Sequence, residues 1–143
     1  MEVKIVSEKE KTLVTIECPC VTPQIHKLKE YIQMYAGKIW ASADTVKKQV
    51  SIQDILYFES VDSKTFLYTC KDVLEIPERL YELETILADY GFLRCSKSII
   101  VNLNQIDTLT PELNRSILAT MHGGDQITIS RRYVKAFLNK LSI

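Results

Sequence analysis

Short runs of isoleucine, leucine, valine and aromatic residues, broken by turn residues, limit the possible folds more than any other feature of the sequence. The runs are 55–60, 65–70, 92–95, 98–103, 115–121 and 126–129. Runs of this length between turn signals are typical of β-strands, because helices need longer periodic segments. Residues 122–125, His-Gly-Gly-Asp, predict a hairpin between the last two runs. Asp62 and Ser63 favour a turn between the first two runs.

Three other segments carry apolar residues at the three- and four-residue steps of a helix. Thr22 and Pro23 predict the start of the first helix, since a hydroxyl cap is followed by the residue favoured at the first helical position, and Gly37 is suited to end it. The second opens at Pro77 and ends at Gly91. The stripes predicted to face the core are Ile25, Leu28, Ile32 and Tyr35; Leu80, Leu83, Leu87 and Tyr90; and, in a third helix with Ser130 as its N-cap, Val134, Phe137, Leu138 and Leu141.

The N-terminal part has its own arrangement. The apolar runs Val3–Val6 and Leu13–Cys18 lie on either side of the charged stretch Ser7–Lys11, which predicts a hairpin. Together with the first helix they form a small strand-strand-helix extension over residues 1–44, ahead of a domain at 45–143. Many short strands with a few short helices predict a mainly β domain with antiparallel sheets, an α+β fold.

The distribution of charge matters more than its total. The chain has 18 basic and 18 acidic residues, and a net charge of zero argues against a nucleic-acid partner. Residues 94–143, however, hold seven basic and three acidic residues, a net charge of +4, so the first 93 residues carry −4. The basic C-terminal third indicates a polyanion partner on one face. A solvated surface explains the same asymmetry without any partner.

The sequence predicts neither a structural metal nor a cofactor. Its four cysteines, Cys18, Cys20, Cys70 and Cys95, do not form the pattern of a disulfide framework. With only His26 and His122 to join them, a zinc site would need ligands scattered along the chain. The N-terminus lacks the pattern of a signal peptide and no apolar stretch is long enough to cross a membrane, so we expect a cytoplasmic protein.

Catalytic groups are scarce in the sequence. A nucleophile, a base and an orienting group must meet in space, and a histidine base would have to be His26 or His122. The pair Gly123-Gly124 lacks the strand and lysine of a phosphate-binding loop. We therefore expect a protein that is not an enzyme.

Groups that bind polyanions form three polar clusters. They are Lys64 in the loop 61–64; Arg94, Ser96, Lys97 and Ser98; and Ser130, Arg131, Arg132 and Tyr133. The last cluster lies where a helix begins, and free backbone N–H groups there favour phosphate. Its adjacent arginines add bidentate donors for phosphate or for the edge of guanine. Alternatively, one arginine forms an ion pair with Asp125 or Glu112.

In their order these clusters resemble the LytTR DNA-binding domain. The matching segments are Asp54-Ile55-Leu56-Tyr57-Phe58-Glu59-Ser60, Phe92-Leu93-Arg94-Cys95-Ser96-Lys97-Ser98-Ile99-Ile100-Val101-Asn102 and Ile127-Thr128-Ile129-Ser130-Arg131-Arg132-Tyr133. The resemblance covers roughly residues 45–143. It implies an elongated, mostly β fold that inserts loops into successive major grooves of DNA. Family members serve bacterial transcription factors, often as the output module of two-component response regulators.

The resemblance also implies site residues. The DNA-binding candidates are Lys64, Ser96, Lys97, Ser98, Ser130, Arg131, Arg132 and Lys135, with Ser63 as a further candidate beside Lys64. Lys97 and Arg132 are expected at base edges, and Lys64, Ser98 and Lys135 at phosphates. Asn102 and Tyr133 match the motif but serve equally well as structural residues. The chain has Ser96 where the family often has histidine, which leaves base preference open there, and Ile99 where it often has an aromatic residue.

The expected function is a bacterial transcriptional regulator that binds repeated promoter sites on double-stranded DNA, as a homodimer. Only 44 residues precede residue 45, too few for a phosphoacceptor receiver domain, so a stand-alone regulator is expected. Residues 1–44 either dock on the domain or pair protomers. The alternative is a β-rich protein-interaction or anion-sensing module in which the arginine pair holds an acidic or phosphorylated ligand.

Overall fold

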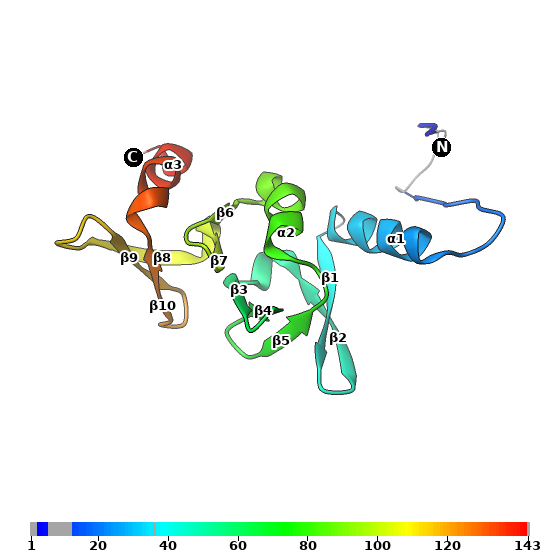
Figure 1. Cartoon of the computed structure of the whole chain (residues 1–143), viewed down its shortest axis with the longest axis horizontal. Helices are drawn as coiled ribbons and strands as arrows, with labels where there is room; N and C mark the ends of the chain where they lie inside the picture. Colours follow the sequence, from blue (N-terminus) through cyan, green and yellow to red (C-terminus); the bar gives the residue numbers. More distant parts are fainter. Residues whose placement is uncertain (1–2, 6–12, 36, 143) are drawn as a thin grey trace.

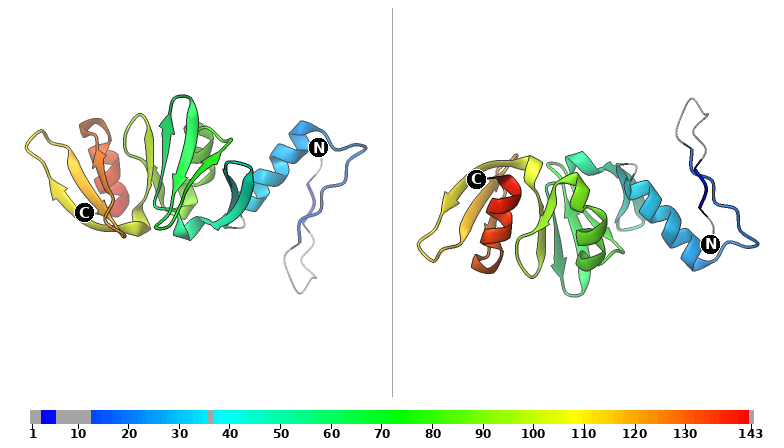
Figure 2. Two further views of the ribbon diagram at one scale, coloured as in Figure 1. Left: turned by 90° about the horizontal axis from the view of Figure 1, so that it is seen from below. Right: turned by 90° about the horizontal axis from the view of Figure 1, so that it is seen from above.

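The computed structural model describes residues 3–5, 13–35 and 37–142. Over these residues the chain is elongated, with α1 (Pro23–Tyr35) at one end and α3 (Arg131–Leu141) with a small sheet at the other (Figures 1 and 2). A larger sheet lies between them and carries α2 (Leu80–Ile86). The mainly β architecture with short helices agrees with the fold predicted from the sequence. None of the described helices is long and apolar enough to span a membrane.

The larger sheet contains seven strands in the order β2-β1-β5-β4-β3-β7-β6. Their bounds are Lys38–Ala43 (β1), Val46–Ser51 (β2), Tyr57–Val61 (β3), Lys64–Tyr68 (β4), Val73–Ile76 (β5), Phe92–Arg94 (β6) and Ile99–Asn102 (β7). Every neighbouring pair is antiparallel. Three short 3₁₀ helices connect elements of the described chain: Ile52–Asp54 (η1), Ala88–Tyr90 (η2) and Leu103–Gln105 (η3).

The smaller sheet has three antiparallel strands, in the order β10-β9-β8. Their bounds are Ile106–Pro111 (β8), Ile117–Met121 (β9) and Gln126–Ile129 (β10). The predicted hairpin at 122–125 joins β9 to β10, and its two central residues, Gly123 and Gly124, have φ of 96° and 100°. Glycine adopts these angles without steric cost, which explains why this turn could be predicted from the sequence.

The two faces of the larger sheet build two separate cores. Phe58 and Ile100 point to one face and pack beneath α2 against Leu83. Val101 points the other way from Ile100, since neighbouring residues of a strand alternate, and it packs with the smaller sheet and α3. Leu56, the residue before β3, belongs to this second core as well. The central sheet is therefore covered on both sides, and the second core fixes α3 against it.

Helix α1 begins as the sequence predicts. The Thr22 hydroxyl accepts a hydrogen bond of 3.3 Å from the backbone N–H of Ile25, which is the expected N-cap. Ile25, Leu28 and Ile32 are half-buried, and the neighbouring Tyr31 packs against the first core. The side chain of Tyr35, the fourth member of the predicted stripe, lies outside the described part of the chain.

The strands predicted near the N-terminus do not form in the described residues. Leu13–Cys18 and the described residues 3–5 of the run Val3–Val6 have no strand structure, and the charged stretch Ser7–Lys11 lies outside the described residues. A strand needs a hydrogen-bonded neighbour and a buried face. Val3 and Ile5 are instead 80% and 94% exposed, so an apolar run alone did not suffice to form a strand here.

The remaining differences concern four strands and one helix start. β1, β2, β5 and β8 were not predicted; β2, for example, has the sequence VKKQVS and is an edge strand with its first four residues exposed. Pro77 does not open α2 but lies in a bend three residues before it, and the extended Arg79 precedes the helix. Gly91 ends the helical region as predicted, with φ of 83°. A Cβ there would lie 2.8 Å from the Asn104 amide.

Candidate nucleic-acid interface

The loop between β6 and β7, residues 95–98, holds one of the predicted clusters in a fixed shape. The backbone N–H of Cys95 donates to the Ile99 carbonyl at 3.0 Å, and that of Ser98 donates to the Ser96 hydroxyl at 3.2 Å. The Ser98 carbonyl accepts from Ser60 on β3 at 2.8 Å. Ser96 and Ser98 are half-buried in this arrangement, whereas Lys97 is exposed at the tip.

Arg94 forms hydrogen bonds to the backbone of this loop, a role that the sequence did not reveal. Its Nε donates to the Ser96 carbonyl at 2.9 Å, and its guanidinium also donates to the Lys97 carbonyl. On the other side its Nη1 lies 3.2 Å from the Glu84 carboxylate on α2. Because the guanidinium is engaged on both sides, Arg94 positions Lys97 and its neighbours. The only signal in the sequence was its place within the polar cluster.

The start of α3 is joined to the same loop. The backbone N–H of Ser130 donates to the Cys95 carbonyl at 2.9 Å, so the second and third predicted clusters are neighbours in space. Ser130 does not cap the helix through its side chain, contrary to the sequence prediction. The backbone closes the first turn instead, because the Tyr133 N–H donates to the Ser130 carbonyl at 2.8 Å. Phe137, fully buried, anchors the helix to the second core.

The third cluster lies on the hairpin between β3 and β4. Asp62 and Ser63 have φ of 50° and 64°, as in a type I′ turn, which confirms the predicted turn. Lys64 is the first residue of β4, and its Nζ lies 3.7 Å from the Glu75 carboxylate in an exposed pair. An exposed pair of this kind contributes little stability, so Lys64 can exchange its partner at small cost.

The strand register brings this hairpin to the same end of the sheet as the 95–98 loop. Glu59 on β3 is paired with Ile99 on β7, so β3 approaches its turn where β7 begins. The 95–98 loop therefore lies beside the hairpin on one side, and beside the start of α3 on the other through the bond from Ser130 to Cys95. The structure thus gathers all three predicted clusters around the 95–98 loop.

Three basic side chains of these clusters, together with Lys135 on α3, are unpaired within the part of the chain that the structure describes. They are Lys97, Arg131, Arg132 and Lys135, all of them exposed. The alternative pairing of an arginine with Asp125 or Glu112 does not form among these described residues. Asp125 accepts a hydrogen bond of 3.3 Å from the Tyr57 hydroxyl, and Glu112 accepts one of 3.2 Å from Ser116. The cations are therefore available to an external anion.

Asn102 belongs to the framework of the fold. It is 1% exposed, and its amide donates to the Ile55 carbonyl at 2.8 Å. Its Oδ1 accepts from the backbone N–H of Asn104 at 3.1 Å. Tyr133, the other residue whose role was open, packs against the second core. Both side chains have a structural role in the free protein.

Three groups beside the loop have raised pKa values: the thiol of Cys95 and the hydroxyls of Tyr57 and Tyr68. Burial raises the pKa of the Cys95 thiol to about 12, and the thiol donates to the Ile99 carbonyl. Tyr57 and Tyr68 stack at 4.3 Å between ring centroids, and burial together with a hydrogen bond to Glu59 raises the pKa of Tyr68 to about 12. The thiolate form of Cys95 is therefore disfavoured at neutral pH.

Comparison with known proteins agrees with this geometry. The sequence model of the LytTr DNA-binding domain matches residues 46–142, more than half of the chain. The chain is 32% identical over 94 residues to the sensory transduction protein LytT of Bacillus cereus, an alignment that covers 66% of this chain and 38% of that protein. It is 33% identical over 87 residues to the transcriptional regulatory protein YpdB of Escherichia coli K12, covering 60% of this chain and 36% of YpdB.

A solved structure of a LytTr DNA-binding domain has the same fold as this chain. The LytTr DNA-binding domain of a methyl-accepting/DNA response regulator from Bacillus cereus superposes with a TM-score of 0.71 at 25% identity, covering 75% of this chain and 98% of that domain. A chain with this fold and this match contains a LytTr DNA-binding domain. It belongs to the LytTR family. It spans about two fifths of the length of LytT, so the regulators' further properties are not carried over.

Proposed function

We propose that this chain is a cytoplasmic transcriptional regulator that binds repeated promoter sites on double-stranded DNA, with its loops in successive major grooves. The observation that carries the proposal is the junction of the 95–98 loop with the start of α3, where Lys97 and the two exposed arginines have no partner in the described chain. Unpaired cations on a hydrogen-bonded framework favour binding to phosphates and base edges, because the loop that carries them is already ordered and less conformational entropy is lost on binding.

The proposed contacts are of two kinds, as the resemblance to the family implies. Lys97, at the tip of the loop, and Arg132, in the first turn of α3, are proposed to contact base edges. Lys64, Ser98 and Lys135 are proposed to contact phosphates, with Ser96, Ser130 and Arg131 completing the surface. Lys135 lies one turn after Arg131 on α3, so both side chains lie on the same side of the helix.

The test is binding to duplex DNA from the promoter of its own operon, measured by gel shift or fluorescence anisotropy. Lys97→Ala or Arg132→Ala should weaken specific binding by about 1–3 kcal/mol and relax base preference. The matched control is Lys71→Ala, which removes an exposed lysine from the β4–β5 turn at the opposite end of the strands. If all three variants bind as the parent does, the proposed site is wrong. Binding of phosphorylated peptides without binding of duplex would favour the anion-sensing alternative.

The protein is further proposed to occupy repeated half-sites as a pair of protomers. Light scattering on duplexes with one or two half-sites should give one and two protomers per DNA. A single protomer on both duplexes would contradict pairing. To test a role of the N-terminal extension, residues 1–36 should be deleted rather than 1–44, because β1 carries Ile39 and Ala41 into the first core.

A further inference from the structure

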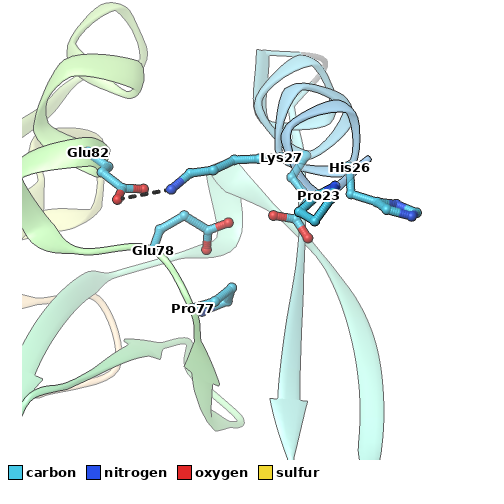
Figure 3. Close-up of a pocket in the computed structure, with 7 residues that line it drawn as sticks. Pro23, His26, Lys27, Pro77, Glu78 and Glu82 are labelled. Atoms are coloured by element: carbon cyan, nitrogen blue, oxygen red, sulfur yellow. Dashed lines mark hydrogen bonds and ion pairs between the residues drawn. The ribbon is translucent and has the colours of Figure 1, made fainter. Parts of the chain in front are cut away.

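A cavity of about 370 Å³ lies between α1 and α2, away from the DNA-binding clusters (Figure 3). Helix α1 contributes Lys27 and Glu30 to one wall. The opposite wall comes from α2, which supplies Glu82, and from the segment before it, which supplies Pro77 and Glu78. Cavities that hold small ligands begin at about 300 Å³, so the space is large enough for a small organic molecule.

Glu78 is the unusual group in this cavity. Its side chain is on a residue only 5% exposed, and its Oε2 atom is buried without a hydrogen-bond partner in the described chain. Figure 3 shows its carboxylate pointing across the cavity toward α1. A buried carboxylate oxygen without a hydrogen-bond partner is costly, so folded proteins rarely contain one.

The surroundings do not neutralise Glu78. Burial raises the pKa of its carboxyl group, and the negative charges of Glu30 and Glu82 add to the effect, while a hydrogen bond from its own backbone N–H and the charge of Lys27 oppose it. The nearest basic group, Lys27, lies 3.4 Å from Glu82, which also accepts a hydrogen bond of 3.1 Å from the Tyr31 hydroxyl. Three carboxylates therefore face this cavity with a single lysine, and that lysine is already engaged by one of them.

The spacing of the acids favours an organic cation over a metal ion. In the residues that the structure describes, no three acidic, histidine or cysteine groups lie close enough to hold a metal. An amine or guanidinium group instead carries several N–H donors on an extended body, which can reach carboxylates that are separated. The apolar surface of Pro77 offers contact for its carbon atoms.

We propose that this space, the α1–α2 cleft, binds a small aliphatic amine or guanidinium compound whose charged group donates to the carboxylate of Glu78. Glu30 provides the second negative charge. The bound compound contacts α1 and α2 together, so it also holds the N-terminal helix on the domain.

The test is isothermal titration calorimetry on the full chain, with agmatine and putrescine as probes. At least one probe should bind with one-to-one stoichiometry, and Glu78→Gln should weaken its binding at least tenfold, which corresponds to about 1.4 kcal/mol. Glu30→Gln changes an exposed residue of α1 and should weaken binding without affecting the fold. The matched control is Asp107→Asn, an exposed carboxylate on β8 in the smaller sheet, which should leave binding unchanged.

Two outcomes would overturn the proposal. One is the absence of saturable binding by either probe below about 1 mM, where a ligand contributes only about 4 kcal/mol. The other is equal affinity of the parent, Glu78→Gln and Asp107→Asn, because that result would mean general attraction of cations to an acidic surface. The folded state of Glu78→Gln is checked by circular dichroism. Should that variant fail to fold, the comparison of Glu30→Gln with Asp107→Asn decides between the same two outcomes.

Discussion

Replacing Arg94 tests whether the shape of the 95–98 loop, and with it the proposed binding of DNA, depends on the hydrogen bonds from this arginine. Arg94→Met keeps the aliphatic part of the side chain, which is largely covered, but removes the donors to the carbonyls of Ser96 and Lys97. Fixing the backbone of one residue costs about 1–2 kcal/mol. If two loop residues lose their fixed position, DNA must order them again on binding, at about 2–4 kcal/mol. Affinity should therefore fall roughly 30- to 700-fold.

The assay separates this effect from loss of a direct phosphate contact. Fluorescence anisotropy over a range of salt concentrations gives both the affinity and the slope of log affinity against log salt. Each phosphate contact contributes about −0.9 to that slope. Because the Arg94 guanidinium is engaged within the protein, Arg94→Met should lower affinity while the slope stays unchanged. Glu84→Gln, which removes only the outer partner of Arg94, should cost less than tenfold.

Two results would refute this reasoning. A slope that becomes shallower by about one contact would mean that Arg94 itself binds phosphate. Unchanged affinity would mean that the remaining bonds, from Ser60 and within the loop, hold residues 96–98 without Arg94.

Four further outcomes are expected. Lys135→Ala should flatten the salt slope by about 0.9 with little change in base preference, as measured by anisotropy on cognate and scrambled duplexes. Asn102→Ala should lower the free energy of unfolding in urea by about 1–3 kcal/mol, because the buried Ile55 carbonyl loses its donor. Phe137→Ala should cost about 3–5 kcal/mol in the same experiment, since it empties the centre of the second core. The pKa of the Glu78 carboxyl is raised above its ordinary value of 4.5, so the folded state loses stability as pH rises above that value. Glu78→Gln removes this loss. The melting temperature of the variant should therefore exceed that of the parent by more at pH 7 than at pH 4.

Features encoded within a few residues were predictable from the sequence. The turns at 62–63 and 123–124 need positive φ, and the residue types that tolerate it stand there. The start of α1 depends on Thr22, whose hydroxyl reaches a backbone N–H three residues away. Each of these features is decided by local chemistry.

Features decided by distant neighbours were not predictable in this way. β2 is polar and forms because β1 pairs with it along its whole length, while the more apolar Leu13–Cys18 forms no strand in the described chain. Within the candidate site, the clusters were found by their order along the chain. The second and third clusters are neighbours because of the hydrogen bond from Ser130 to Cys95, residues that lie 35 positions apart in the sequence. The support from Arg94 was hidden because it binds backbone carbonyls, which every residue has.

Helix α2 is only seven residues long, yet its Glu82 pairs with Lys27 of α1 and its Glu84 pairs with Arg94. Positions two apart on a helix point about 200° from each other, so the two ion pairs lie on opposite sides of one short helix. Helix α2 therefore joins the N-terminal helix to the arginine that holds the 95–98 loop, since one of its carboxylates contacts each of them.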